Sequence, residues 1–132
     1  MKIIKFKDFI NENKNLDNRM HNGIVGDIYY YLRTQFESKN DNKLMIFQNV
    51  RIEEDLDKSI KPNILIEYDG KIITIEVFSG NITDVIKKYS NQMGDISEMF
   101  FYDYKKKKWY DLSTKENSLS KILQIDLSET IK

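Results

Sequence analysis

The sequence of 132 residues has no cysteine and a single histidine, two residue types on which many active sites depend. It contains no cysteine, which excludes disulfides, thiolate zinc sites and cysteine nucleophiles. It contains one histidine, His21, which excludes His-rich metal sites and argues against a Ser-His-Asp triad. No apolar run approaches the ~20 residues of a membrane-spanning helix, and no secretion signal is recognisable. We therefore expect a cytoplasmic protein.

An excess of charge of either sign is also absent. Lys+Arg and Asp+Glu each number 21, so the formal net charge is zero. This balance argues against a highly basic DNA-coating protein and against a highly acidic DNA mimic. Hydrophobic residues make up 40% of the chain and aromatic residues 12%, which is enough for one core and argues against a wholly disordered chain.

The N-terminal part is expected to be separate from the folded domain. Apolar residues recur at helical spacing over 1–10, which predicts a short amphipathic segment. Residues 11–22 are polar and Asn-rich, as is typical of a linker, and His21 is expected to be solvated there. The predicted division is therefore 1–22 for segment and linker, and 23–132 for a single folded domain.

Periodicity and composition predict the elements of that domain. Helices are expected at 23–37, 81–93 and 118–131, and strands at 44–53, 97–104 and 109–113, around a hairpin at 62–80. Asp69-Gly70 stands between the two β-branched runs of the hairpin, where both turn residues need positive φ. The order is helix, strand, strand, strand, helix, strand, strand, helix. It indicates an α/β fold, bordering on α+β, with a mixed central sheet of four or five strands and helices packed on it.

The hairpin carries the residues of greatest chemical interest. A metal-dependent phosphodiesterase needs two neighbouring acids to hold Mg²⁺ and benefits from a Lys that stabilises negative charge. The hairpin contains Pro62-Asn63 and also Glu76-Val77-Phe78, with Glu76 thirteen positions after Asn63. Together these residues resemble the PD-(D/E)xK motif of the restriction-endonuclease-like superfamily. The order of elements over about 23–113 is also similar to that family's. The resemblance implies a restriction-endonuclease-like fold.

The resemblance also implies roles for individual residues. Glu76, Asn63 and Lys88 are the candidate catalytic residues, with Lys88 replacing the Lys that the motif has at Phe78. Glu76, Asn63 and Asp27, an acid near the start of the first helix, are the candidate metal ligands. Asn63 stands where the family has Asp and lacks its charge, so the active site is expected to be degraded. Mg²⁺ is expected if catalysis survives, and otherwise no cofactor.

A basic run follows in the second half of the chain. It consists of Lys105, Lys106, Lys107 and Lys108 and stands beside Trp109 and several tyrosines. Lysines contact phosphates and aromatic rings stack on bases, so this combination is typical of nucleic-acid binding. These five residues are the candidate nucleic-acid-binding residues. The alternative interpretation is a charged hairpin turn whose lysines discourage aggregation between sheet edges.

A second, independent resemblance lies at the N-terminus. MKIIKFKDFINE resembles the head-targeting peptides of internal proteins in large tailed phages. Those peptides are cleaved after a Glu preceded two residues earlier by Ile or Leu, as in Ile10-Asn11-Glu12. The resemblance implies packaging in a phage virion and entry into the host-cell cytoplasm.

These patterns favour a catalytically degraded nuclease-like domain that binds nucleic acid or a nuclease complex, rather than an enzyme. Two alternatives stay open. One is an active Mg²⁺-dependent nuclease with relocated ligands, for example an acid from 53–57 beside Glu76. The other is an injected phage protein that inhibits a host defence nuclease by protein–protein contact. The expected partners are nucleic acid or a host nuclease or defence protein, with no membrane, and a homodimer stays open.

Overall fold

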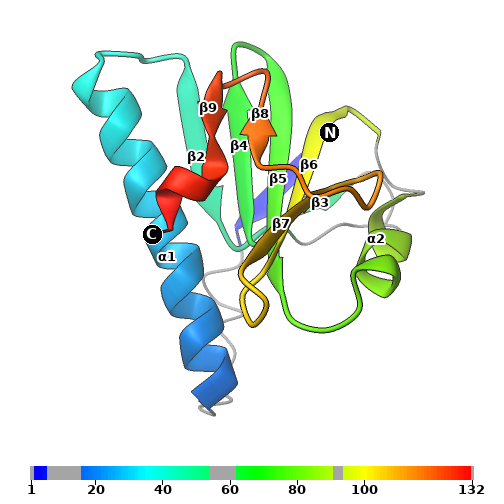
Figure 1. Ribbon diagram of the computed structural model, residues 1–132. Coiled ribbons are helices and arrows are strands. Elements are labelled where there is room, and N and C mark those ends of the chain that lie inside the picture. The colour runs from blue at the N-terminus through cyan, green and yellow to red at the C-terminus, as the bar shows by residue number, and fades with distance from the viewer. Residues whose placement is uncertain (1, 6–15, 54–61, 91–93, 132) are drawn as a thin grey trace.

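The computed structural model describes residues 2–5, 16–53, 62–90 and 94–131 (Figure 1). The helices of these residues are α1 (Leu16–Ser38), α2 (Ile82–Ser90) and the 3₁₀ helix η3 (Leu127–Thr130). The strands are β1 (Lys2–Lys5), β2 (Leu44–Gln48), β3 (Val50–Glu53), β4 (Ile64–Tyr68), β5 (Lys71–Phe78), β6 (Ile96–Asp103), β7 (Lys108–Asp111), β8 (Leu119–Ser120) and β9 (Ile125–Asp126). None of the helices in the described ranges is long and apolar enough to cross a membrane.

A five-stranded sheet in the order β2-β4-β5-β6-β7 forms the centre of the fold. Its neighbouring strands are antiparallel except β5 and β6, which are parallel and are connected through α2. β1 pairs with β3, and β8 with β9, in two small additional sheets. The predicted mixed α/β architecture is therefore confirmed, although the predicted order of elements is matched only loosely. The restriction-endonuclease-like assignment stays a prediction.

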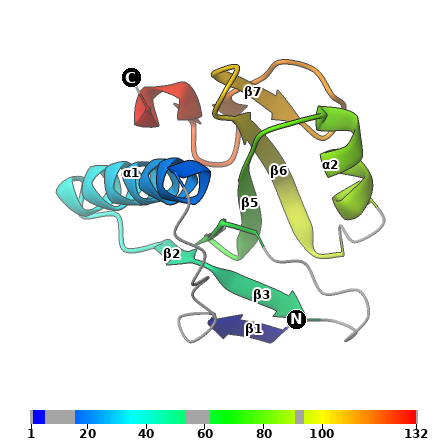
Figure 2. The same cartoon turned by 90° about the horizontal axis from the view of Figure 1, so that it is seen from below.

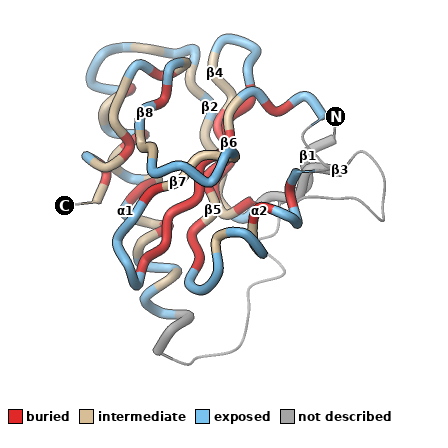
Figure 3. The backbone as a smooth tube through the Cα atoms, turned by 45° about the vertical axis from the view of Figure 1, so that its right-hand side comes forward, coloured by how far each residue is buried: buried red, intermediate tan, exposed pale blue. Residues whose placement is uncertain are grey.

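Helices α1 and α2 cover opposite faces of this sheet (Figure 2). On one face, α1 packs through residues at positions i, i+3, i+7 and i+11, none more than 4% exposed: Val25, Ile28, Leu32 and Phe36. On the other face, Ile86 and Tyr89 of α2 pack against Leu65 and Phe101. The buried residues run along β5 and β6 through the middle of the molecule (Figure 3). The central sheet therefore separates two hydrophobic cores.

The hairpin and the elements after it follow the sequence prediction. Asp69 and Gly70 have φ angles of 51° and 81°, as the turn between β4 and β5 requires. Strand β5 is buried along most of its length, as predicted for a central strand. Helix α2 lies inside the predicted range 81–93, whose last three residues are outside the described residues. Strands β6 and β7 agree with the predicted strands to within two residues at each end.

Helix α1 begins at Leu16, seven residues before the predicted start at residue 23. The predicted polar linker is therefore helical from Leu16 onward. Sequence periodicity gives only a weak signal for this extension, because Leu16 and Met20 are the two apolar residues among the polar ones of 16–22. A tertiary contact of His21, described below, anchors the first turns of the helix.

Residues 2–5 form a strand, so the predicted helical segment is wrong for these residues. They pair antiparallel with β3, with Lys2 opposite Glu53 in the register. The neighbouring β-branched residues Ile3 and Ile4 favour extended backbone. The rest of the predicted segment, including Ile10-Asn11-Glu12, lies outside the described residues.

Two other predictions need correction. The single strand expected at 44–53 is divided into β2 and β3 at Asn49, whose φ of 51° interrupts the extended backbone. The terminal helix expected at 118–131 is instead β8, β9 and η3. Gln124 has a φ of 57°, and Asp126 accepts a hydrogen bond from the backbone N–H of Ser128 at 3.0 Å. Such local contacts compete with a continuous helix.

The turn at Gly70 provides a test of the hairpin. Gly70→Ala is expected to lower the free energy of unfolding by about 1–2 kcal/mol, because an L side chain is disfavoured at positive φ. A new Cβ there meets no atom within 4 Å, so collision contributes nothing. Gly23→Ala in α1 also meets no atom within 4 Å and is expected to raise stability by about 1 kcal/mol. Urea denaturation of both variants measures the contrast, and equal effects would contradict it.

Candidate functional site

Asn63 lies just before β4 and connects three parts of the fold. Its Oδ1 accepts a hydrogen bond from the backbone N–H of Val77 at 2.7 Å. The same Oδ1 lies 3.2 Å from Nε2 of His21 in α1. Its backbone carbonyl accepts from the N–H of Asn49 at 3.0 Å. Because one amide oxygen has two lone pairs, both acceptor positions of Oδ1 are occupied.

His21 is the second member of this contact, and its predicted solvated position is wrong. It is half-buried in α1, and Nε2 lies 2.9 Å from the carbonyl oxygen of Val77. Both neighbours of Nε2, this carbonyl and Asn63 Oδ1, are acceptors, so Nε2 carries the proton. The imidazole ring also meets Tyr104 edge-on, with ring centroids 6.2 Å apart. His21 therefore ties the first half of α1 to the end of β5.

Glu76 lies on the other face of β5, where it is half-buried beneath α2. The hydroxyl of Tyr89 donates a hydrogen bond to its Oε2. Burial raises the pKa of Glu76 from an ordinary value of 4.5 to about 7, against the opposing effects of the Tyr89 hydrogen bond and the charge of Lys88. Burial also raises the pKa of Tyr89, which keeps its phenol protonated as the donor.

The predicted catalytic residues are thus only partly brought together. The β4–β5 ladder ends with Ile64 opposite Ile75, so Asn63 and Glu76 follow it at the same end of the sheet. Their side chains nevertheless form contacts on opposite faces of the sheet, Asn63 with His21 of α1 and Glu76 with Tyr89 of α2. Lys88 is exposed on α2 and is near enough for its charge to lower the pKa of Glu76.

The position of the motif lysine is filled by an apolar ring. Phe78 is 7% exposed and packs against Tyr110, with ring centroids 6.5 Å apart. Neither a charge nor a hydrogen-bond donor is therefore available from this side chain.

These contacts do not fit a Mg²⁺ site. Asn63 Oδ1 already accepts two hydrogen bonds, and Glu76 Oε2 accepts one from Tyr89, whereas Mg²⁺ needs oxygen atoms that are free to bind it. Asp27 is exposed on α1, and no hydrogen bond joins it to either residue in the described part of the chain. The same part holds no group of three His, Cys, Asp or Glu side chains that could hold a metal ion. Acids 54–57 lie outside it, so the relocated-ligand alternative stays a prediction.

Residues 105–107 lie in the turn between β6 and β7, and Lys108 is the first residue of β7; together these four lysines are called the lysines of the turn. The Oδ1 of Asp103, a carboxylate 1% exposed, accepts the backbone N–H groups of Lys105 and Lys106 at 3.0 and 3.1 Å. Lys107 completes the turn with a φ of 58°. The side chains of all four lysines of the turn, 105–108, are exposed. A buried acid thus fixes the backbone that presents them.

Three of the four aromatic residues beside this turn are buried. Tyr102, Tyr104 and Trp109 are each 5–7% exposed, and the rings of Tyr102 and Trp109 pack 4.9 Å apart. These three buried rings are therefore not accessible for the predicted stacking of bases. The lysines remain the candidate nucleic-acid contacts, whereas Trp109 is part of the core.

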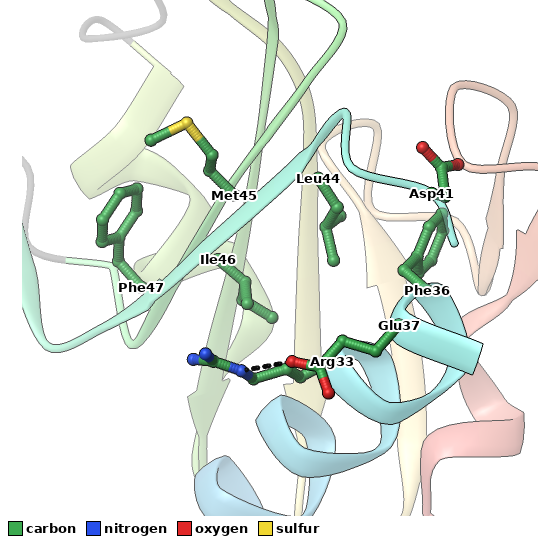
Figure 4. A pocket seen from close by; sticks show the side chains of 8 residues that line it. All are labelled: Arg33, Phe36, Glu37, Asp41, Leu44, Met45, Ile46 and Phe47. Carbon is green, nitrogen blue, oxygen red and sulfur yellow. Dashed lines mark hydrogen bonds and ion pairs between the residues drawn. The ribbon is translucent and has the colours of Figure 1, made fainter. Parts of the chain in front are cut away.

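A pocket of about 280 Å³ lies away from these residues, between α1 and β2 (Figure 4). It is lined by Arg33, Phe36, Glu37, Asp41, Leu44, Met45, Ile46 and Phe47. Arg33 Nε lies 3.0 Å from Glu37 Oε1, and the Tyr68 hydroxyl donates to Asp41 at 2.6 Å. This hydrogen bond lowers the pKa of Asp41. Sequence analysis predicts no function for this pocket.

Several residues of the site carry no signal in the sequence. Tyr89 belongs to the apolar stripe of α2, and nothing in its spacing pairs it with Glu76. His21 stands in a polar stretch and Asp103 at the end of a strand. Their partners lie in other elements or in backbone N–H groups, which residue patterns do not reveal.

Comparison with known proteins adds no assignment. No protein-family model matches the sequence, and no curated protein matches it. The proposals below therefore depend on geometry.

The Asn63 contacts can be tested by replacing the acceptor. Asn63→Leu is expected to lower the free energy of unfolding by about 1–3 kcal/mol, because the backbone N–H of Val77 loses its acceptor. His21 Nε2 loses the contact with Asn63 but keeps the carbonyl of Val77. Asn63→Asp retains an oxygen in the same place and is expected to cost less. Urea denaturation compares the two variants. Equal losses would show that Asn63 does not act through its oxygen.

The raised pKa of Glu76 predicts a pH dependence. Its stabilising contribution is fully present below pH 4.5 and is lost as the pH rises through about 7, because folding favours the protonated carboxyl. The largest loss that this shift allows is about 3 kcal/mol. Glu76→Gln stays neutral and still accepts from Tyr89, so it should lack this dependence. Urea denaturation between about pH 5 and 8 tests this expectation, and parallel curves for the two proteins would refute it.

Proposed function

We propose that the protein is a catalytically degraded nuclease-like domain that binds the phosphate backbone of nucleic acid through the β6–β7 turn. The observation that carries this proposal is the presentation of four exposed lysines, 105–108, on one turn held by Asp103. Lysines that neutralise phosphates release condensed counterions, and this release drives binding that is independent of base sequence.

The contacts of the motif residues support the absence of catalysis. The amide oxygen of Asn63 is occupied by two donors, and Phe78 is packed in the core. Glu76 is hydrogen-bonded to Tyr89 with a pKa near neutrality. A metal-dependent phosphodiesterase needs charged acids around its ion, and these residues instead serve hydrogen bonding and packing.

The buried aromatic rings favour contact with the backbone over contact with bases. Proteins that bind single strands combine positive charge with exposed rings on which bases stack. Here Tyr102, Tyr104 and Trp109 are in the core, and the half-buried ring of Tyr110 packs against Phe78. A duplex has one negative charge per about 1.7 Å of its axis, so it is the form of nucleic acid that a purely cationic turn binds best.

The position of the turn also agrees with the proposal. The carboxyl ends of the parallel strands β5 and β6 lie at one edge of the sheet, which is the usual place for ligands in open α/β sheets. The β6–β7 turn, the β5–α2 loop and the N-terminal half of α1 all lie at this end, which is the lower end in Figure 1. Lys43 and Lys71 lie at the opposite end, beside the turn between β4 and β5.

Replacement of two turn lysines tests the proposal. Lys106→Gln/Lys107→Gln is expected to weaken binding to a labelled DNA duplex and to reduce the slope of log affinity against log salt by about two. The matched control Lys43→Gln/Lys71→Gln removes the same charge from the far end of the sheet. It should leave the slope nearly unchanged. Fluorescence anisotropy over about 50–200 mM salt measures both.

Binding to a single strand and a cleavage assay, measured alongside duplex binding, distinguish the rival functions. A single strand bound more tightly than the duplex would contradict backbone binding without stacking. Cleavage in Mg²⁺ or Mn²⁺ that disappears in Glu76→Ala would contradict the loss of catalysis. No binding by the wild-type protein would refute the proposal and favour contact with a host nuclease or defence protein.

A further inference from the structure

A small pocket lies directly beside the lysine turn. Its volume is about 230 Å³, and it is lined by Lys107, Lys108, Trp109, Glu116, Asn117 and Ser118. The residues across the pocket from the turn are held against β7. Tyr110 and Glu116 form an antiparallel bridge, and the N–H of Asn117 donates to the carbonyl of Trp109 at 3.0 Å. The two walls of the pocket are therefore fixed by backbone contacts.

The polar side chains of the far wall are already engaged elsewhere. Asn117 Nδ2 donates to Asp111 at 3.2 Å, and the Ser118 hydroxyl donates to Asp126 at 2.6 Å. Apart from Trp109, the pocket therefore offers a ligand mainly the positive charges of Lys107 and Lys108. Ammonium groups recognise an anion as point charges, without the fixed geometry of a guanidinium.

A carboxylate of the protein itself lies at this pocket. Glu116 Oε1 is 3.8 Å from Lys108 Nζ, and the two side chains are 65% and 49% exposed. An exposed ion pair at this separation contributes little to stability, since water screens it and both side chains lose freedom by pairing. Separating the pair therefore costs the folded protein little.

We propose that this pocket binds one backbone phosphate of the nucleic acid, at which Glu116 is a competing anion. Lys107 and Lys108 hold the phosphate, and Glu116 pairs with Lys108 when no nucleic acid is bound. The inference rests on the proposed function and adds to it one phosphate position and an intramolecular competitor. It assigns Glu116 a role that opposes binding, whereas a merely structural residue would support binding or leave it unchanged.

The test is Glu116→Gln, which keeps the size of the side chain and removes its charge. We expect tighter binding to the labelled DNA duplex, by up to about fivefold, because Lys108 no longer has to separate from an exposed ion pair before it contacts the phosphate. The salt slope should stay close to that of the wild-type protein, because both proteins contact the same number of phosphates. A duplex RNA of the same sequence should show the same gain, because the phosphate chemistry is shared.

Glu37→Gln is the matched control. Glu37 also forms an exposed ion pair, with Arg33 at 3.0 Å and with side-chain exposures of 67% and 55%. Its replacement changes the net charge by the same amount but at the C-terminal end of α1, away from the turn. It should leave both affinity and slope close to those of the wild-type protein.

The outcomes separate this inference from the proposed function. A gain in Glu116→Gln that exceeds the gain in Glu37→Gln supports the inference. Equal gains in the two variants would show that the effect comes from net charge alone, and this would overturn the inference about Glu116. In that case, duplex binding that depends on Lys106 and Lys107 would still support the proposed function. Weaker binding in Glu116→Gln would also overturn the inference, with the circular dichroism spectrum showing whether the fold is intact. A wild-type protein that binds no duplex would overturn both.

Discussion

The amide oxygen of Asn63 is the contact on which the arrangement of this fold depends. It accepts from Val77 in β5 and from His21 in α1, while the Asn63 carbonyl accepts from Asn49 between β2 and β3. One residue therefore fixes the start of β4, the end of β5 and the first half of α1 relative to one another. The effect continues into β6, because the N–H of Tyr104 donates to the carbonyl of Phe78 at 3.0 Å. The turn that presents the lysines is thus anchored to the strand that Asn63 fixes.

The two departures from the PD-(D/E)xK pattern make physical sense together. A neutral amide at Asn63 can accept two N–H groups without adding a charge to the end of the sheet. An apolar ring at Phe78 can pack against Tyr110 where a lysine would have to reach water. Glu76 then has no cation two positions along the strand, and burial raises its pKa to about 7. At both Asn63 and Phe78 a charged side chain would be costly to bury, and the residues present suit packing better than they suit metal-dependent chemistry.

Sequence reasoning succeeded where one residue pattern decides the local structure. Asp69-Gly70 predicts the hairpin, and the apolar stripe of α1 predicts a helix, because turn geometry and helical periodicity are local properties. It failed where a contact distant in sequence decides. The helical conformation of the first turns of α1 is accompanied by contacts of His21 with Asn63 and Val77, which are separated from it by 42 and 56 positions in the sequence. For the site, the pattern identified Asn63 and Glu76 but not their partners, because nothing local indicates that Tyr89 or His21 faces them.

A formal net charge of zero constrains how such a protein can bind nucleic acid. Without a large positive field, long-range attraction is weak, so affinity has to come from lysines held close to phosphates. The buried carboxylate of Asp103 meets this requirement by fixing the backbone of the turn while its charge is turned inward. Glu116 has the opposite effect, since its exposed carboxylate is beside Lys108. In the proposed function, the two acids together give a neutral protein a local cationic site whose strength depends on the charge density of its ligand. Under this proposal a duplex, with closely spaced phosphates on both strands, displaces Glu116, whereas an isolated anion of single charge gains little over the carboxylate already present.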